Sequence, residues 1–391
     1  MKNSLLSIFI LFLLLLHCIP FQSKATVDIQ SKSCCIENKM LGIDANYVLD
    51  MNNLLFRTWR YHFQRIEPYA FFSNLGANYF RLRLFVKENG SYGLHYAIDT
   101  AKMVHQQGLQ PYMVIFLSSD WADLGKQPAP ESWISEYDWF NLTLEQQGTI
   151  VYNYTSQTVS YFLQNGIDID LYEIGNEIDF GLCGYFEEDA LKRENTSYMM
   201  QTTWKTMTYL IHAAIDGVKS VDPTSQFLLH ITHWWDYNFS QAFFSYMIDS
   251  GVQLDFMGLS FYPSSGIFNL TQTFNGNGNG TKSQLLFKKT TQELFKSIQK
   301  QIIICEYAYP SSSKIFGQFS WFNHAVNEYP LTKEGQKEWL ADFLQWCYQQ
   351  SAIAGMFYWS PEFFSIIWSP LSLFSYMGFA KPAVEAFKQY Q

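Results

Sequence analysis

The sequence is short of basic charge and of long apolar runs. Its 391 residues carry 26 Lys and Arg against 35 Asp and Glu, a formal net charge of -9. Proteins that follow the phosphates of nucleic acid need a basic surface, and no basic run that would bind an anionic membrane is present. After the N-terminal segment, no apolar run is long enough to span a bilayer. We therefore expect neither nucleic acid nor a membrane as a partner of the mature protein.

Cysteine is also scarce, with six residues in the whole chain. Removal of an N-terminal signal takes Cys18 and leaves an odd number, so at least one thiol stays free or pairs between chains. The spacing of the cysteines matches no zinc pattern. Cys305 stands in an apolar run, where we interpret it as a small buried hydrophobe rather than a catalytic thiol.

The N-terminus has the composition of an export signal. Lys2 precedes an apolar run over residues 5–16, and Ser23-Lys24-Ala25 offers small residues for cleavage. We predict a signal peptide over residues 1–25 and one domain over 26–391, with a retained signal anchor as the alternative. Asn-X-Ser/Thr sequons favour a secreted glycoprotein of a eukaryotic route, and they stand at Asn89, Asn141, Asn153, Asn195, Asn238, Asn269 and Asn279.

Short apolar runs recur along the chain, each followed by a segment with helical spacing. The runs cover residues 40–43, 79–85, 111–117, 171–175, 227–231, 256–261, 302–305 and 355–359. Strands that alternate with helices pair in parallel, so eight such units predict an α/β fold, a single closed (β/α)8 TIM barrel. A doubly wound sheet is the competing fold, but no glycine-rich phosphate turn follows the first run. The glycine- and asparagine-rich stretch over 274–283 is interpreted as a loop.

The ends of these runs are unusually polar. In a TIM barrel the chemistry lies at the carboxyl ends of the strands. Glu177 and Glu306 end the fourth and seventh runs, roughly across the barrel mouth from each other. Glycoside hydrolysis needs two such carboxyls, because one protonates the leaving oxygen while the other attacks the sugar or activates water. Two solvated loop acids are the alternative interpretation.

At these residues the sequence resembles a known family. "GNEI" and "ICEYAYP", which contain the two glutamates, resemble the clan A glycosidases. "DWADLGKQ" from Asp120, "GLSFYP" from Gly258 and "FRLRLF" from Phe80 narrow the likeness to the endo-β-1,4-galactanases of glycoside hydrolase family 53. The likeness runs from about Leu41 nearly to the end of the chain, and "DWADLGKQ" is its most specific element.

The resemblance implies a secreted, retaining enzyme that cleaves β-1,4-galactan, the side chains of plant pectin, without a cofactor. By position, Glu177 resembles the acid/base and Glu306 the nucleophile. Asn176 resembles the residue that binds the sugar 2-hydroxyl.

Two further residues resemble those that keep the nucleophile ionised and oriented. They are Arg81, as an adjacent cation, and Tyr262, as a hydrogen-bond donor. Arg83 shares the strand face of Arg81 and is the alternative for its role.

Aromatic rings at strand ends are candidates for the sugar platform, because a ring face packs on the apolar face of galactose. Trp121 and Trp359 are our choices, with core packing as the alternative. Asp44 and Asp123 are expected to bind sugar hydroxyls, with a helix cap or a turn as the alternative. His233, near a strand end, is expected to touch the substrate.

The sequence departs from the family pattern at two strand ends. The family usually has a His-Tyr-Ser-Asp run after its third strand, where this chain has Leu117-Ser118-Ser119-Asp120. It usually has a glutamate after the final tryptophan, where this chain has Ser360. Because both positions lie near the sugar, two alternatives remain: a related clan A β-glycanase and a non-catalytic carbohydrate-binding protein.

We expect no metal and a monomer. His230 and His233 are three residues apart on a strand that alternates faces, so they cannot both point into the pocket. A calcium site stays undecided, because the loop after the eighth run shows no acidic cluster.

Overall fold

The computed structural model describes residues 39–52, 58–266 and 279–390. The predicted signal peptide, three of the six cysteines and the sequon at Asn269 lie outside the described residues. Parallel strands form one closed barrel, whose order is β1-β12-β11-β10-β9-β6-β5-β4. The strands are β1 (Met40–Asp44), β4 (Tyr79–Leu84), β5 (Gln110–Ile115), β6 (Leu171–Ile174), β9 (Gln226–Ile231), β10 (Phe256–Phe261), β11 (Gln301–Tyr307) and β12 (Ile353–Trp359). Each predicted run overlaps one of these strands, so the predicted (β/α)8 barrel is confirmed.

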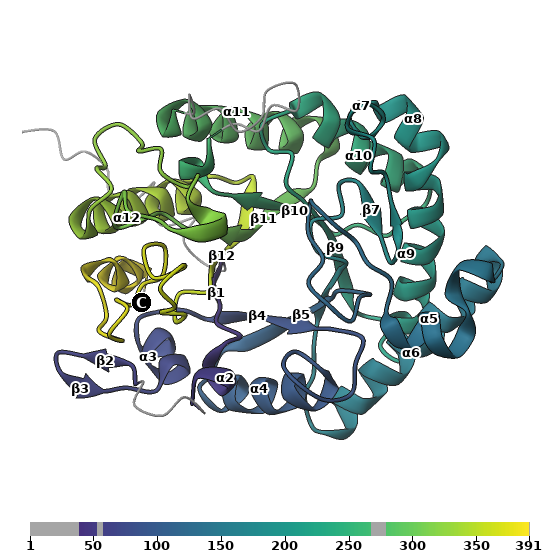
Figure 1. The fold of residues 1–391 in the computed structure, drawn as a ribbon, viewed down its shortest axis with the longest axis horizontal. Coiled ribbons are helices and arrows are strands. Elements are labelled where there is room, and N and C mark those ends of the chain that lie inside the picture. The colour runs from purple at the N-terminus through teal and green to yellow at the C-terminus, as the bar shows by residue number, and fades with distance from the viewer. Residues whose placement is uncertain (1–38, 53–57, 267–278, 391) are drawn as a thin grey trace, which may run out of the picture. The chain divides into compact units, whose positions relative to one another are not determined.

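Helices form a layer outside the strands (Figure 1). The main ones are α3 (Pro68–Asn74), α4 (Leu94–Gln106), α6 (Leu144–Gln164), α9 (Thr203–Lys219), α10 (Tyr237–Asp249), α11 (Gly280–Ile298) and α12 (Lys333–Gln349). Shorter elements lie in the connections: α2 (Val48–Asn52), α5 (Glu131–Tyr137), α7 (Ala190–Arg193), α8 (Thr196–Gln201), and the hairpins β2 (Arg60–Tyr61) with β3 (Gln64–Arg65) and β7 (Gly181–Leu182) with β8 (Tyr185–Phe186). The described helices include none that is both long and apolar enough to cross a membrane.

One local prediction needs a correction. The stretch over 274–283 was interpreted as a loop, but its last residues begin α11 at Gly280. The side chain of Asn279 accepts hydrogen bonds from the backbone N–H groups of Thr281 and Lys282, which satisfies the first turn. An N-cap therefore starts the helix inside a segment whose composition favours a turn.

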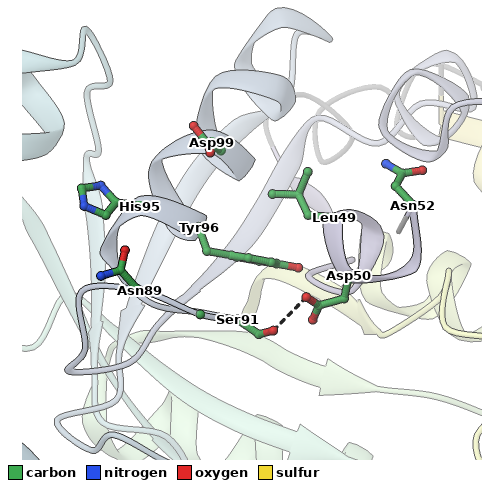
Figure 2. A pocket seen from close by; sticks show the side chains of 9 residues that line it. Leu49, Asp50, Asn52, Asn89, Ser91, His95, Tyr96 and Asp99 are labelled. Atoms are coloured by element: carbon green, nitrogen blue, oxygen red, sulfur yellow. Dashed lines mark hydrogen bonds between the residues drawn. The ribbon is translucent and has the colours of Figure 1, made fainter. Parts of the chain in front are cut away.

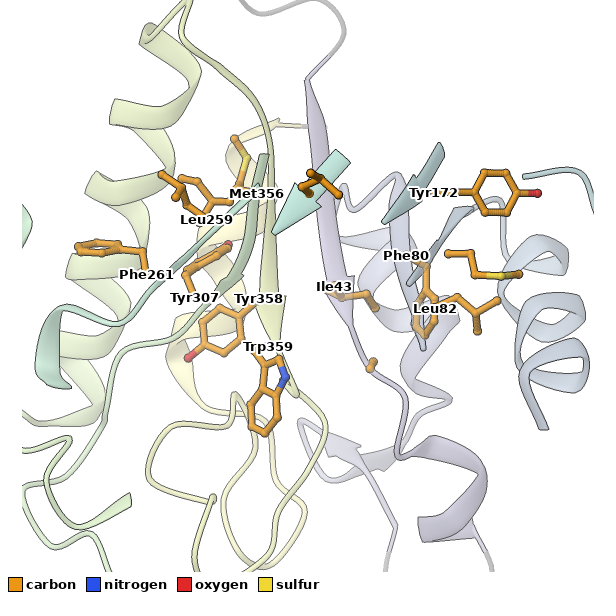
Figure 3. Packing of buried hydrophobic residues seen from close by; sticks show 14 of the residues in the cluster. Ile43, Phe80, Leu82, Tyr172, Leu259, Phe261, Tyr307, Met356, Tyr358 and Trp359 are labelled. Carbon is orange, nitrogen blue, oxygen red and sulfur yellow. The ribbon is translucent and has the colours of Figure 1, made fainter. Parts of the chain in front are cut away.

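The strands bury both faces, and β4 shows how the sequence provides for this. Phe80, Leu82 and Leu84 face outward and join the core between the barrel and the helices. Figure 3 shows Phe80 and Leu82 on this side, near Ile43 of β1. A buried apolar side chain of this size contributes about 1.5 to 3 kcal/mol. The alternate residues of the same strand face the barrel interior, and two of them are arginines.

A register shift in β11 sets the direction of its last residues. Leu259 of β10 pairs with Ile304, but the next residue, Ser260, pairs with Glu306, so Cys305 is an extra residue in β11. Such a bulge interrupts the alternation of faces along a strand. Cys305 packs in the interior cluster and Tyr307 in the outer core. The bulge is therefore what turns Glu306 towards the barrel mouth.

The described cysteines carry free thiols. Cys183, Cys305 and Cys347 are all buried and unbridged. The interpretation of Cys305 as a small buried hydrophobe is confirmed by its burial in the interior cluster.

Candidate active site

The loop after β6 is built to hold Glu177 at the barrel mouth. Gly175 has φ +77°, and a Cβ there would lie 2.4 Å from Ile178, so a side chain does not fit. Glu177 itself has φ +47°, a conformation that costs a non-glycine residue energy. Nε2 of Gln127, at the end of "DWADLGKQ", donates to the carbonyl oxygens of Asn176 and Glu177 at 2.8 and 3.1 Å. The loop after β5 therefore braces the loop after β6.

The guanidinium of Arg81 is the centre of the site, and it is fully buried. Nη1 donates to Asp44 at 2.8 Å and to Glu306 at 2.7 Å. Nε donates to Glu173 at 3.0 Å, and Nη2 donates to Glu173 and to Oδ1 of Asn176 at 2.7 Å. A guanidinium has five N–H groups, so every donor of Arg81 has an acceptor. This side chain holds four groups from β1, from β6 and the loop after it, and from β11 in one geometry.

Glu306 lies between a cation and a hydroxyl. Oε1 accepts from Arg81, and Oε2 accepts from the hydroxyl of Tyr262 at 2.9 Å. The side chain is nearly fully buried. Burial raises the pKa of Glu306, while the charge of Arg81 opposes this rise. Both oxygens are fixed by donors, which suits a carboxylate that must point in one direction.

Among the described residues, Glu177 has only neutral hydrogen-bond donors. Ser260 Oγ lies 2.6 Å from Oε1, and the backbone N–H of Leu124 lies 3.4 Å from Oε2. The residue is partly accessible at the mouth, yet protein atoms surround its carboxyl group. Burial and the nearby charges of Glu306 and Asp123 raise the pKa of Glu177 well above its usual value. Of the two carboxyls, Glu177 is therefore the one that the protein keeps protonated.

Sequence reasoning missed three polar groups behind the two glutamates. Glu173, within β6, is fully buried against Arg81 and against the hydroxyl of Tyr112. Burial alone would raise the pKa of Glu173, but Arg81 and His230 hold this pKa at about 2. His230 of β9 and Ser260 of β10 complete this group. A charged residue in the middle of an apolar strand was the signal that could have revealed Glu173.

The two arginines of β4 differ in their partners. Arg83 donates to Oδ1 of Asp44 and makes no contact with Glu306, so Arg81 is the arginine that meets the carboxyl of β11. Asp44 accepts from both arginines and from Asn46 and is fully buried. The expectation that Asp44 binds a sugar hydroxyl therefore finds no support in its placement.

Arg83 lies in a cluster of aromatic rings. Its Cζ is 5.1 Å from the ring centre of Trp121 and 5.2 Å from that of Trp359. The rings of Tyr47 and Tyr92 complete the cluster at 5.3 and 5.7 Å. A cation over ring faces stabilises both partners. The two predicted platform tryptophans thus share one charged neighbour, and their own ring centres are 6.0 Å apart.

Asp123 and His233 have roles within the protein. Asp123 accepts from Nε1 of Trp121 at 3.0 Å and from the backbone of Gly125 at 2.7 Å, which is the turn that was the alternative interpretation. His233 is buried with Nδ1 on Asp179 and Nε2 on Glu194. Burial alone would lower the pKa of His233, but these carboxyls raise this pKa to about 9. No ring nitrogen of His233 is left for a sugar, so its predicted contact finds no support here.

One group among the described residues has the spacing of metal ligands. It consists of Glu173, His230 and Cys305, deep inside the barrel. Glu173 is already paired with Arg81, whose positive charge opposes a metal ion at the same position. The described contacts therefore favour hydrogen bonding over metal binding in this group.

A hollow of about 470 Å³ lies near the mouth, between α2 and the start of α4. Figure 2 shows the ring of Tyr96 along it, with Asn89 on one side and Asp50 on the other. Ser91 donates to Asp50 at 2.8 Å, and the hydroxyl of Tyr96 donates to the carbonyl of Asn46. Since Asn46 also binds Asp44, the wall of this hollow supports the charged centre of the site.

Comparison with known protein families shows which family the chain belongs to. The family model described as Glycosyl hydrolase family 53 matches residues 40–386. The chain belongs to this family. It is thereby a glycosidase, and the predicted family is confirmed.

Two similar curated proteins come from fungi. The probable arabinogalactan endo-beta-1,4-galactanase A of Neosartorya fischeri is 28% identical over 294 residues, 73% of each chain. The arabinogalactan endo-beta-1,4-galactanase A of Emericella nidulans is 28% identical over 301 residues, which is 74% of this chain and 75% of the relative.

Solved structures agree with the fold. A fungal β-1,4-galactanase has a TM-score of 0.73 at 21% identity, covering 90% of this chain and 99% of its own. The family 53 catalytic domain of Ignisphaera aggregans has the same TM-score and identity, covering 90% of this chain and 96% of its own.

The predicted departure from the family at Ser360 has a local consequence. Ser360 Oγ lies 3.3 Å from Nη2 of Arg83, a weak contact. Nη1 of Arg83 and Nε1 of Trp359 are buried and have no acceptor among the described residues. Two unpaired donors beside the tryptophans are groups that a sugar oxygen can satisfy.

Proposed function

We propose that the protein is a secreted endo-β-1,4-galactanase that acts with retention through Glu177 and Glu306. The observation that carries this proposal is the contrast between the two carboxyls at one barrel mouth. Glu306 is paired with a cation and fixed by Tyr262, while Glu177 has no cation and a strongly raised pKa. Environments that separate the pKa values of two carboxyls in this way are typical of a nucleophile and a general acid.

In the first step, Glu306 attacks the anomeric carbon of the sugar while Glu177 protonates the departing glycosidic oxygen. Arg81 and Tyr262 hold the carboxylate of Glu306 in place, so little reorganisation is needed at the moment of attack. As the glycosyl-enzyme forms, the negative charge of Glu306 is lost, which lowers the pKa of Glu177.

In the second step, Glu177 acts as a base. The lower pKa lets its carboxylate persist after it has given up its proton, and it then takes a proton from the water that hydrolyses the intermediate. Regaining the charge on Glu306 restores the raised pKa of Glu177. The close coupling of the two carboxyls thus supports both halves of a double displacement.

The proposed substrate follows from the relatives, whose printed names specify arabinogalactan endo-beta-1,4-galactanase. Trp121 and Trp359 supply ring faces for a neutral sugar, and Asn176, held by Arg81, is the proposed partner of the 2-hydroxyl. Secretion is supported by the export signal and the sequons in the sequence.

The unpaired donors at Arg83 and Trp359 could bind oxygens of a different sugar, so a related β-glycan is the second candidate substrate. Hydrolysis of potato galactan, measured beside mannan, xylan and mixed-linkage β-glucan, tests the choice. Faster release of reducing ends from galactan supports the proposal. A preference for another glycan at equal enzyme concentration overturns the substrate, and binding without any hydrolysis overturns the enzyme.

A further inference from the structure

A row of hydrogen bonds leads from the barrel interior to Glu177. Oε1 of Glu173 lies 2.9 Å from Nδ1 of His230, and Nε2 of His230 lies 2.9 Å from Oγ of Ser260. Ser260 Oγ lies 2.6 Å from Oε1 of Glu177. The first three residues are almost completely buried and come from β6, β9 and β10. Three neighbouring strands therefore line up their side chains on one oxygen of the predicted acid/base.

The direction of the first bond is fixed. Both oxygens of Glu173 accept from the permanently charged guanidinium of Arg81, so Glu173 acts as a carboxylate whose oxygens only accept hydrogen bonds. Nη2 of Arg81 is 3.3 Å from Nδ1 of His230, but its two hydrogens already go to Glu173 and to Asn176. Nδ1 of His230 therefore carries a hydrogen and donates it to Glu173.

The direction of the other two bonds depends on Nε2. If His230 is neutral, Nε2 accepts from Ser260, and the proton of Glu177 must point back at Ser260. If His230 is an imidazolium, Nε2 donates to Ser260, whose hydroxyl then donates to Oε1 of Glu177. In that arrangement the acid proton of Glu177 lies on Oε2, and the row stays satisfied after this proton is given away.

The balance of buried charges favours the imidazolium. The carboxyl groups that contact a guanidinium in the centre are Asp44, Glu173 and Glu306, and the guanidiniums are those of Arg81 and Arg83. Buried charges are stable only when they are paired. Two guanidiniums leave one carboxylate charge over, and a positive His230 next to Glu173 removes the excess while Glu177 is neutral.

We propose that His230 and Ser260 are positioning residues that orient the acid/base, with His230 as an imidazolium donating through the Ser260 hydroxyl to Oε1 of Glu177. This inference rests on the proposed function for the role of Glu177 as the acid/base. The protonation of His230 is independent of the substrate. The row supports the carboxylate of Glu177 after proton donation and confines the transferable proton to Oε2.

Other titratable groups face this row from each packed element. Around His230 they are Glu173 of β6, Arg81 of β4, and Cys305 and Glu306 of β11. Around Glu177 they are Glu306, Tyr262 after β10, Asp123 after β5 and Asp179 of its own loop. None of these groups replaces Ser260 as the hydrogen-bond donor to Oε1.

The direct test is nitrogen NMR of the full chain with ¹⁵N-labelled histidine at neutral pH. The signal of His230 is identified by its loss in His230→Gln, or by its displacement in Ser260→Ala if the first variant fails to fold. Two protonated ring nitrogens are expected. One unprotonated nitrogen overturns the proposal, and this result needs no substrate, so it is separate from a failure of the galactanase assignment.

The pH profile of kcat/KM supplies the second test, because activity is lost as pH rises through the pKa of the acid. Ser260→Ala removes the donor to the ionised form of Glu177, so the basic limb should move up by about one pH unit or more. Ser260→Thr keeps the hydroxyl and should restore the limb, and Ser264→Ala, a buried serine outside the row, should leave it in place. A limb that stays or moves down in Ser260→Ala overturns the proposed direction of the bonds.

Discussion

Nη1 of Arg81 donates to Oε1 of Glu306 at 2.7 Å, whereas the carboxyl of Glu177 receives hydrogen bonds only from neutral groups. The same guanidinium also binds Asp44, Glu173 and Asn176. One fully satisfied cation therefore creates the asymmetry between two glutamates that share a barrel mouth. Contacts within the barrel therefore establish the difference between Glu306 and Glu177 before any substrate binds.

Replacing Glu306 tests the nucleophile. Glu306→Ala should lower galactan hydrolysis at least about a thousandfold without unfolding the barrel, because the attacking group is removed. Added azide should then restore turnover and give a glycosyl azide of inverted configuration. Glu338→Ala, an exposed glutamate on α12, is the matched control. A rescued product of retained configuration would assign the nucleophile to another residue.

Replacing Glu177 tests the acid. A general acid matters in proportion to how badly the leaving group needs a proton, so Glu177→Ala should nearly stop cleavage of galactan yet spare the first step on an activated aryl galactoside. In the wild type, activity should fall as pH rises through the strongly raised pKa of Glu177 and as pH falls through the pKa of Glu306, which burial raises and Arg81 opposes. Equal losses on both substrates in the variant would contradict the role.

The stereochemistry of the product tests the mechanism without any mutation. If Glu306 forms a covalent intermediate, the first reducing ends released should be β-anomers, because two displacements restore the original configuration. Early-time proton NMR of the reducing end measures this before mutarotation. An α-anomer that appears first would rule out retention and the roles given to both glutamates.

Arg81 should be essential for stability as well as for activity. Arg81→Met leaves three buried carboxylates without their shared cation, which should cost about 3 to 5 kcal/mol in the free energy of unfolding. Arg81→Lys keeps the charge but has too few donors for all the acceptors, so a smaller loss is expected. Thermal unfolding compares both with Arg65→Lys, an exposed arginine on β3. A melting temperature unchanged in Arg81→Met would refute the central position of this residue.

Glu362 should make stability depend on pH. Burial raises the pKa of Glu362 to about 8. In the part of the chain that the structure describes, only Oε1 has a partner, the backbone N–H of Tyr47. A carboxyl with a raised pKa in the folded state contributes stability that is lost as pH rises from its unfolded value through the folded one. Glu362→Gln should therefore match the wild type in melting temperature near pH 5 and exceed it near pH 9. A constant difference across this range would show that Glu362 does not titrate as stated.

The architecture was predictable because it depends on the pattern of neighbouring residues in the sequence. Apolar runs separated by helical segments give the parallel barrel, and a barrel places strand ends at one mouth. The positions of Glu177, Glu306 and Trp359 near strand ends followed from this periodicity, whereas Trp121 lies in the loop after β5. The family was predictable from motifs such as "DWADLGKQ", whose glutamine braces the loop that carries Glu177.

What only the tertiary structure decided is which side chains meet. Strict alternation along β11 would turn Glu306 outward with Ile302 and Ile304, and only the bulge at Cys305 brings it into the mouth. Arg81 and Arg83 share a strand face, and the pairing of strands assigned the first to Glu306 and the second to the aromatic cluster.

The row from Glu173 through His230 and Ser260 to Glu177 belongs to the tertiary structure as well. It depends on how three neighbouring strands, β6, β9 and β10, pair with one another in the barrel. The sequence by itself determined the barrel, the family and the strand-end glutamates, because periodicity and motifs are properties of neighbouring residues. Register, bulges and the sharing of buried donors decided the rest, because they are settled only when distant segments pack against one another.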